Sequence, residues 1–335
     1  MVSLTLSNPT GAVLGSQSTA TLTIADNDVS APTGNPLDDP AFYVRQHYYD
    51  FLGRLPDDGG LAFWTSEISQ CGSNQACINE RRVAVSNAFF SEQEYQHTAS
   101  YVFLLYRASF GNDQPFPNPD WFDVGLSQQL RNEAKKLPRY LSFVRDRSQV
   151  VGGSNLAQTQ MALANAFVLR TEFTNRYSTS LTGTEFVNAV LATIQGTSGA
   201  DLSSQAAVLV NHFNTGRRGL VMFHLANDYW IGCDRLPGSP AAPCVPAGFG
   251  AAVDNRPFIE AEYNRSFVYS QYSGYLRRDS DIGGFLFWLT EVSKSPPRNV
   301  PRQRAMVCSF VTSTEYQQRL SPVATHSNSE CPPPP

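Results

Sequence analysis

The protein has 335 residues, of which only 16% are charged, and its formal net charge is −4. Since an ordinary soluble domain carries roughly 25% charged residues, neutral polar side chains must cover most of this surface. The 25 basic residues form no run, and no apolar stretch approaches the roughly 18 residues of a membrane-spanning helix. We therefore expect no nucleic-acid partner and no transmembrane segment.

Two segments of alternating apolar and polar residues open the chain. Residues 2–6 and 19–24 follow this pattern, and a turn sequence at 8–11 lies between them. The pattern predicts two β-strands, which cannot be stable alone in water. Because Met1 is followed directly by a strand, without a basic or apolar leader, we expect this chain to continue a longer protein whose export signal lies upstream.

The same segments carry a family resemblance. Val-Ser-Leu-Thr-Leu-Ser-Asn-Pro-Thr-Gly-Ala through Ala-Thr-Leu-Thr-Ile-Ala-Asp-Asn-Asp resembles the last strands of a Calx-beta domain, a β-sandwich that can bind calcium. The resemblance implies that residues 1–28 are a truncated sandwich and that Asp26 and Asp28 belong to an incomplete calcium site. Calcium needs six to eight oxygen ligands, and most of the loops that would supply them are absent. The alternative is that Asp26-Asn27-Asp28 only ends a strand with turn-forming residues.

Residues 29–40 are rich in Pro, Gly and Asp and are predicted to be a linker. After them the chain repeats itself, because residues 43–68 align without a gap on residues 267–292 with ten identities. Weaker relatives lie between these two segments. We count four units, of which the middle two are degenerate, near residues 42–97, 100–177, 184–231 and 258–320.

Each unit is predicted to be helical. Apolar residues recur at helical spacing in residues 44–52 and again in 61–68, Gly53 is a natural C-cap, and Asp57 or Asp58 is a natural N-cap. A third helix follows over residues 79–95. The sequence therefore predicts a mostly α fold, in which a short N-terminal β-hairpin precedes a four-unit helical repeat body at 41–331 and an extended Pro tail at 332–335 follows it.

The repeat carries a second resemblance. F-Y-V-R-Q-H-Y-Y-D-F-L-G-R-L-P-D-D-G-G-L-A-F-W, followed by a helix that ends in S-E-Q-E-Y, is similar to the bacterial domain of unknown function numbered 4214. The resemblance covers about residues 42–320, but the second unit departs from the signature at Gly111-Asn112-Asp113 and the third lacks the Trp. It implies a helical fold related to phycobilisome linker domains in a secreted or surface protein, and it implies no activity.

Six cysteines form three locally close pairs. Sequence alone allows 15 pairings. Short spans rich in Gly, Pro or Ser favour the pairs Cys71–Cys77, Cys233–Cys244 and Cys308–Cys331. A zinc site would need closely spaced ligands such as C-x-x-C, which the chain lacks. Disulfides indicate an oxidising setting, so we expect an extracellular or cell-surface protein; reduced structural thiols are the alternative.

Two polar residues recur at equivalent places: Arg54 and Asp57 in the first unit, and Arg278 and Asp281 in the last. An arginine and a carboxylate can clamp an anion. They can equally pair with each other or cap helix ends. Repetition at the hairpin turn favours this structural interpretation.

Large aromatic residues recur next to these turns: Phe63 and Trp64 in the first unit, and Phe287 and Trp288 in the last. Such rings could form platforms for sugars. Their helical spacing favours a place in the core instead.

Motifs for catalysis are missing from the sequence. There is no H-E-x-x-H and no G-x-S-x-G, and His47 with Asp50 is the only local candidate pair. We predict a protein that is not an enzyme and has no cofactor in its helical region, calcium being confined to the intact upstream sandwich. The predicted function is a non-catalytic structural or adhesive module that binds an unknown surface protein or glycan. The alternatives are a glycan-binding module, with solvent-facing aromatic rings in a groove, and a hydrolase with a divergent site.

Overall fold

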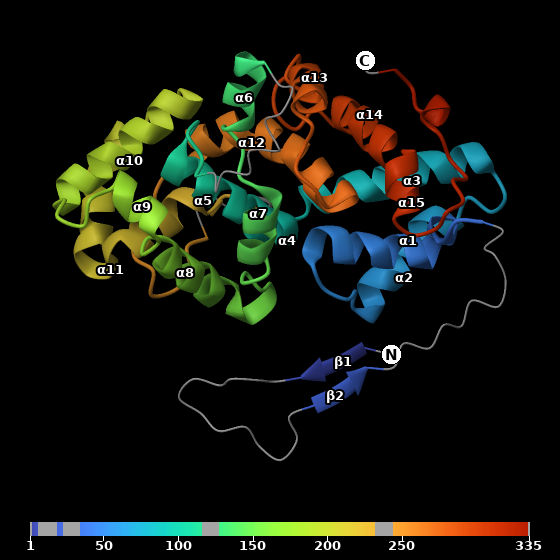
Figure 1. The fold of residues 1–335 in the computed structure, drawn as a ribbon, viewed down its shortest axis with the longest axis horizontal. Coiled ribbons are helices and arrows are strands. Elements are labelled where there is room, and N and C mark those ends of the chain that lie inside the picture. Colours follow the sequence, from blue (N-terminus) through green and yellow to red (C-terminus); the bar gives the residue numbers. More distant parts are fainter. Residues whose placement is uncertain (1, 6–18, 23–33, 116–126, 232–243, 334–335) are drawn as a thin grey trace, which may run out of the picture.

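The computed structural model describes residues 2–5, 19–22, 34–115, 127–231 and 244–333. Helices are the dominant secondary structure in this part of the chain, so the prediction of a mostly α fold is confirmed (Figure 1). Two strands, β1 (Val2–Thr5) and β2 (Thr19–Leu22), pair antiparallel with Val2 opposite Leu22. They lie within the two segments predicted as strands. Asp26 and Asp28 lie outside the described residues.

The first and last units contain the same succession of helices. The first consists of α1 (Pro40–His47), the π-helical turn η2 (Tyr48–Leu52), α2 (Asp58–Ser69), α3 (Gln75–Ser91), α4 (Gln93–Tyr95) and the π-helical turn η3 (Gln96–Ser100). The last consists of α12 (Arg256–Gln271), η6 (Tyr272–Leu276), α13 (Ile282–Val292), α14 (Val300–Val311) and α15 (Thr314–Gln318).

The two middle units are less regular. The second contains α5 (Tyr101–Phe110), α6 (Gln128–Ala134), α7 (Tyr140–Arg147), α8 (Leu156–Phe167) and α9 (Thr171–Arg176). The third contains two long helices, α10 (Gly183–Ser198) and α11 (Ala206–Ala226), with a short 3₁₀ turn (Ser203–Gln205) between them. The helix that carries the Trp in the first and last units thus has no counterpart in the third unit as far as the structure describes it.

The helical body begins earlier than the predicted linker allows. Leu37 is fully buried, and the side chain of Asn35 donates hydrogen bonds to the carbonyls of Gln317 (3.2 Å) and Val323 (2.8 Å). Asp39 caps α1 by accepting a hydrogen bond from the Phe42 amide at 2.6 Å, and Pro40 occupies the first helical position, where it is well tolerated. Residues 34–40 therefore belong to the folded body, which corrects the predicted boundary.

The first and last units pack directly against each other, with α3 beside α14 (Figure 1). Phe51 and Tyr275 occupy equivalent positions in the repeat, and their ring centroids lie 4.8 Å apart at an interplanar angle of 82°. A Cβ added to Gly274 would overlap the Phe51 ring, so this close contact requires glycine. Contact between equivalent residues is the signature of a two-fold relation. The two best-matched units therefore form a pseudo-symmetric pair.

A single buried helix connects the second unit to this pair. Every residue of α5 is buried. Arg107 on α5 donates to both carboxylate oxygens of Glu262 on α12, at 2.7 and 3.0 Å, and also to the carbonyl of Lys136 at 2.7 Å. Because both side chains are almost completely inaccessible, the pair fixes the place of α5 against the last unit.

Disulfides join Cys71 to Cys77, between α2 and α3, and Cys308 to Cys331, between α14 and the C-terminal segment (residues 321–333). Both are expected local pairs. Cys244 is also disulfide-bonded, while its expected partner Cys233 lies outside the described residues. None of the described helices combines the length and the apolarity that crossing a membrane requires.

Candidate functional site

The repeated arginines form ion pairs inside their own units. Arg54 donates to both oxygens of Glu94 at 2.6 Å, and Arg278 donates to both oxygens of Glu315 at 2.6 and 2.9 Å. The bidentate bonds raise the pKa of Arg54 and lower the pKa of Glu315. The anion-binding edge of each guanidinium is thus already occupied by a side chain of the protein.

The repeated aspartates are helix caps. Asp57 accepts a hydrogen bond from the Gly60 amide at 2.8 Å, and Asp281 accepts one from the Gly284 amide at the same distance. This bond lowers the pKa of Asp57. Each aspartate lies 3.7 Å from the arginine of its unit, so that contact is secondary to the cap.

The sequence did not identify the glutamates as the partners of the arginines. Glu94 and Glu315 both belong to the second aligned block of the repeat, about 40 positions after the arginines. Their recurrence was the available signal, but neighbouring aspartates were the simpler choice from sequence alone.

The repeated aromatic residues divide into an inner and an outer member. Trp64 and Trp288 are half-buried and pack on the hydrophobic core. Phe63 and Phe287 are 55% and 54% exposed, so the expectation that they lie in the core is wrong. The phenyl ring stands against the indole at 4.9 Å in the first unit and at 5.1 Å in the last, with an angle of 73° in both. We call each Phe and Trp together an aromatic pair.

The two aromatic pairs lie on different sides of the helical body. Figure 1 shows α2 at its lower edge and α13 at its upper edge, with α1, α3 and α14 between them. This placement follows from the pseudo-symmetric packing of the two units. Each pair therefore offers its own contact surface.

The local pair considered for hydrolysis does not converge on a shared site. His47 is fully buried, with Nδ1 2.8 Å from the Tyr43 carbonyl and Nε2 2.7 Å from the Ser86 hydroxyl. Desolvation lowers its pKa to about 4. The Asp50 carboxylate instead accepts hydrogen bonds from Arg277 and Arg319, each at 2.9 Å.

A pair of buried histidines lies in the third unit. His212 and His224 stack with ring centroids 3.8 Å apart at 13°. Their ring nitrogens contact the carbonyls of Ala251 (2.9 Å) and Phe249 (2.8 Å). Burial, and in second place His212, lower the pKa of His224 to about 3. Over the described ranges, no group of three or more His, Cys, Asp or Glu side chains is placed to hold a metal ion.

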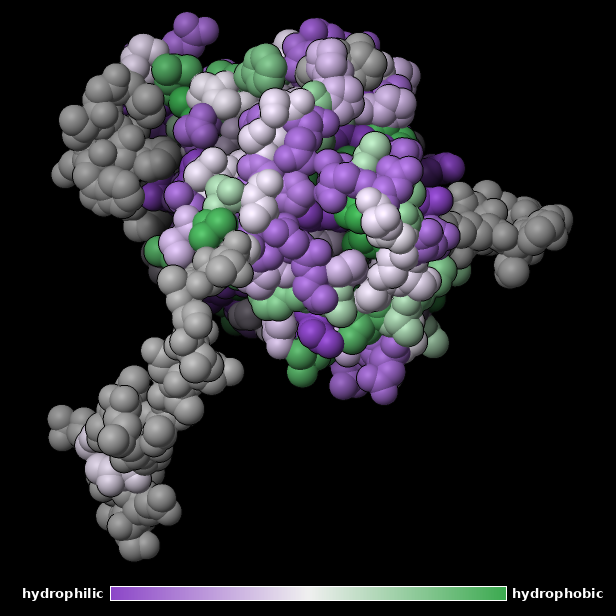
Figure 2. All heavy atoms as spheres, turned by 90° about the vertical axis from the view of Figure 1, so that its right-hand side faces the viewer, coloured by the Kyte–Doolittle hydropathy of each residue, from purple (hydrophilic) through white to green (hydrophobic). Residues whose placement is uncertain are grey.

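A cavity of about 650 Å³ lies between α3 and α14. Its wall includes Val83 on α3, Ala305 and Val311 on α14, and Pro332 and Pro333 of the C-terminal segment. Figure 2 shows the side of the molecule on which α3, α14 and this segment lie, where apolar residues appear among the polar ones. Pro332 and Pro333, which belong to the predicted extended Pro tail, are exposed and contribute to the wall of this cavity.

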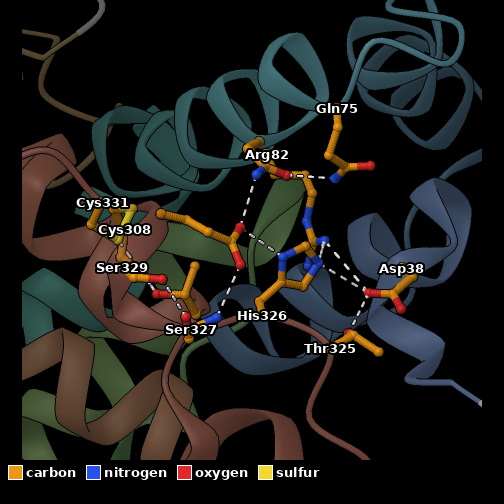
Figure 3. A network of polar contacts seen from close by, with 12 residues as sticks. Asp38, Gln75, Arg82, Cys308, Thr325, His326, Ser327, Ser329 and Cys331 are labelled. Atoms are coloured by element: carbon orange, nitrogen blue, oxygen red, sulfur yellow. Dashed lines mark hydrogen bonds and ion pairs between the residues drawn. A yellow bond between two sulfur atoms is a disulfide. The ribbon is translucent and has the colours of Figure 1, made fainter.

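A polar network holds the C-terminal segment over this cavity (Figure 3). The ring nitrogens of His326 lie 2.9 Å from Glu330 and 3.1 Å from Asp38. Arg82 is hydrogen-bonded to His326 and lies 3.7 Å from Asp38, which also accepts a hydrogen bond from Thr325 at 2.9 Å. The Cys308–Cys331 disulfide ties the segment to α14 as a covalent bond.

Comparison of the chain with protein-family models, with curated proteins and with solved structures finds no match. The functional interpretation therefore rests on the geometry of the chain itself. In that geometry the repeated polar residues stabilise the fold, and the repeated phenylalanines remain exposed.

Proposed function

We propose that this protein is a non-catalytic structural or adhesive interaction module of an exported bacterial protein. One observation carries the proposal: Phe63 and Phe287 are exposed at equivalent positions of the two best-matched units. The repeated polar residues around them are occupied by caps and ion pairs. An exposed phenyl ring that adds little to the core is the kind of residue that anchors a contact with a partner.

The arrangement supports a bridging role. Since α2 and α13, the helices that carry the two aromatic pairs, lie at different edges of the helical body, one molecule can contact two partners, or two sites on one large partner. Two linked sites increase the overall avidity without any new contact. A protein that connects surfaces benefits from this property.

The setting of the protein is part of the proposal. Two disulfides in the described residues support a location outside the cytoplasm, in secretion or at the cell surface. We also propose that residues 42–320 belong to the domain of unknown function numbered 4214, and that residues 1–28 derive from a Calx-beta sandwich. Calcium would then bind in the intact sandwich and no cofactor in the helical region.

A glycan is the second candidate for the partner. Each indole lies beside an exposed phenyl ring, and such an aromatic surface can stack on the apolar face of a sugar. A glycan array tests this candidate directly. Saturable binding to a defined sugar that Phe63→Ser and Phe287→Ser abolish would favour the glycan over a protein partner.

The test of the proposal is adhesion of the labelled protein to cells of the bacterium that produces it. The double variant Phe63→Ser/Phe287→Ser should bind at least tenfold more weakly, and each single variant should fall between it and the natural protein. The matched control is Leu169→Ser, which removes an apolar side chain that is 77% exposed elsewhere. Unchanged adhesion of the double variant would contradict the proposal.

A further inference from the structure

A second cleft, of about 340 Å³, lies where the first, second and last units meet. Its walls come from the turn after α1, from α7 and from the π-helical turn η6. The residues that the following argument uses are Tyr49, Gly53, Val144, Arg147 and Val151. The cleft is separate from both aromatic pairs and from the cavity between α3 and α14.

The cleft carries an excess of positive charge. The charged side chains in its wall are Arg54, Arg147, Arg277, Asp50 and Glu94. Arg54 is paired with Glu94, and Asp50 is shared by Arg277 and Arg319. The wall thus holds three arginines and two carboxylates, which leaves a local net charge of +1.

Arg147 is the arginine without an anionic partner. Its one hydrogen bond to the described residues runs to the Phe51 carbonyl at 3.3 Å, and no carboxylate of the described chain forms an ion pair with it. Burial lowers the pKa of its guanidinium, although arginine stays charged at neutral pH. A desolvated cation with free N–H groups is costly unless an anion joins it.

The turn after η2 holds this guanidinium in place. Gly53 has a φ of 63°, and a Cβ at this position would lie 2.7 Å from Nη1 of Arg147. Only glycine accommodates both the left-handed backbone and the close approach of the arginine. The guanidinium thus lies directly against this turn, where it also donates to the Phe51 carbonyl.

The rim of the cleft is apolar. Tyr49, Val144 and Val151 line it and are exposed to solvent. An apolar wall with one well-placed charged group is the usual composition of a small-molecule site. It favours a ligand that has an apolar body as well as an acidic group.

We propose that this cleft binds a small organic anion, whose acidic group bonds to Arg147 and whose apolar body packs on Tyr49, Val144 and Val151. A guanidinium fork matches a carboxylate or a sulfonate in two parallel hydrogen bonds. The inference does not depend on the proposed adhesive role, because it uses different residues.

The experiment compares two fluorescent probes of similar size. 1-Anilinonaphthalene-8-sulfonate carries an acidic group, and N-phenyl-1-naphthylamine is its uncharged counterpart. Arg147→Gln should weaken binding of the anionic probe at least tenfold, since hydrogen bonds to charged groups are the strong ones, and should leave the uncharged probe nearly unchanged. Arg147→Lys should retain part of the affinity because it keeps the charge. The proposal would be overturned if Arg147→Gln bound the anionic probe as tightly as the natural protein does.

Three further measurements locate the site and define the ligand. Ala76→Trp, in the wall of the cavity between α3 and α14, should not change binding of the anionic probe; loss of binding would assign the probe to that cavity and overturn the proposal. Val151→Glu places a negative charge on the exposed rim, where it does not threaten folding, and should weaken the anionic probe as Arg147→Gln does. Benzoate should displace the probe at lower concentration than sulfate, and the reverse order would show a plain anion site and contradict the apolar half of the proposal.

Discussion

Arg277 combines an unfavourable backbone conformation with a long-range ion pair. It lies at the position that Gly53 occupies in the first unit, and its φ of 50° is also left-handed. A residue other than glycine in this conformation costs about 1 kcal/mol. The Arg277 guanidinium bonds to Asp50, whose carboxylate is completely buried, at 2.9 Å. The last unit thereby neutralises a charge of the first unit that glycine could not reach.

Buried neutral histidines form a second feature at this scale. His47 lies at the contact between the first and last units, where it also lies near Asp50 and Arg82. His224 stacks on His212 in the third unit. Desolvation dominates in both, and lowers the pKa of His47 to about 4 and that of His224 to about 3.

These shifts predict that acid destabilises the protein well above the range in which carboxylates titrate. Unfolded histidine has a pKa of about 6.5, so between this pH and the folded value only the unfolded chain binds the proton. The stabilisation is complete above about pH 6.5 and is lost as the pH falls. When the pH falls from 7 to 5, the unfolding free energy should decrease by about 2 kcal/mol for each of the two histidines. Urea unfolding at both pH values measures this difference.

The control for this prediction is the double variant His47→Gln/His224→Gln. It removes both titrating groups, so the difference in unfolding free energy between pH 7 and pH 5 should shrink by most of the predicted amount. A difference as large as that of the natural protein would assign the acid sensitivity to other groups.

Local spacing explains which of the site residues could be predicted. Asp57 and Asp281 precede their partner amides by three residues, so their capping role follows from the sequence next to them. Glu94 is 40 positions from Arg54, and Arg147 is 96 positions from the Phe51 carbonyl. Such contacts exist only after folding. Phe63 lies one position before Trp64, which turns it away from the inward face of α2.

At the scale of elements, the C-terminal segment is attached to the body by polar contacts and a disulfide. Gln317, which is fully buried, accepts hydrogen bonds from the amides of Thr325 (2.7 Å) and His326 (3.0 Å). The polar network of Figure 3 and the Cys308–Cys331 disulfide complete its attachment. The segment is therefore held by directional bonds and a covalent link.

Removing that link should release the segment. The disulfide joins residues 23 positions apart, and cross-linking a loop of this length stabilises the folded state by about 3 kcal/mol. In Cys308→Ser/Cys331→Ser, thermolysin should cut before Val323, the one large apolar residue of 321–333, while the helical body stays intact. Mass spectrometry of the fragments measures the cut. Cys71→Ser/Cys77→Ser, which opens a remote loop, should leave the segment protected, and resistance of the first variant would contradict the prediction.

The helices of the third unit could be predicted only in part from the sequence. Its first helix, α10, begins with a capping box of Thr182 and Glu185 before an apolar run, a signal that the sequence contains. The repeat model also implied a second helix, but the segment between α10 and α11 forms only a 3₁₀ turn. The third unit lacks the Trp that packs this helix on the core in the first and last units. Similarity to those units therefore predicted one helix too many in the third unit.

At the scale of the whole molecule, the four units are connected out of chain order. The first packs on the last through Phe51, Phe90 and Tyr275. The second packs on the last through the buried pair of Arg107 and Glu262. An array of stacked repeats would have contacts between neighbours in sequence only. Here the last unit cannot open without exposing the cores of the first and second units, which are distant from it in sequence.

This connectivity predicts a single cooperative unfolding transition for the helical body. Glu262→Gln leaves the buried Arg107 without its anion and should cost about 3–5 kcal/mol. Far-ultraviolet and near-ultraviolet circular dichroism should shift together in thermal melts of this variant. Glu260→Gln, which breaks an exposed pair with Arg298, should cost less than about 1 kcal/mol. Two separate transitions, or equal effects of the two substitutions, would contradict the prediction.

The hydrogen bonds of Asn35 to Val323 and of Ser321 to Gly34 place the entry and the exit of the helical body side by side. Tension applied along a polypeptide that contains this body would act on that junction and, through the Cys308–Cys331 disulfide, on α14, while most residues between the two ends would bear little load. Rupture would release a length on the order of 1,000 Å, since an extended residue spans about 3.3–3.6 Å. Under tension, the body would thus hold a reserve of polypeptide length and release it only above a threshold force.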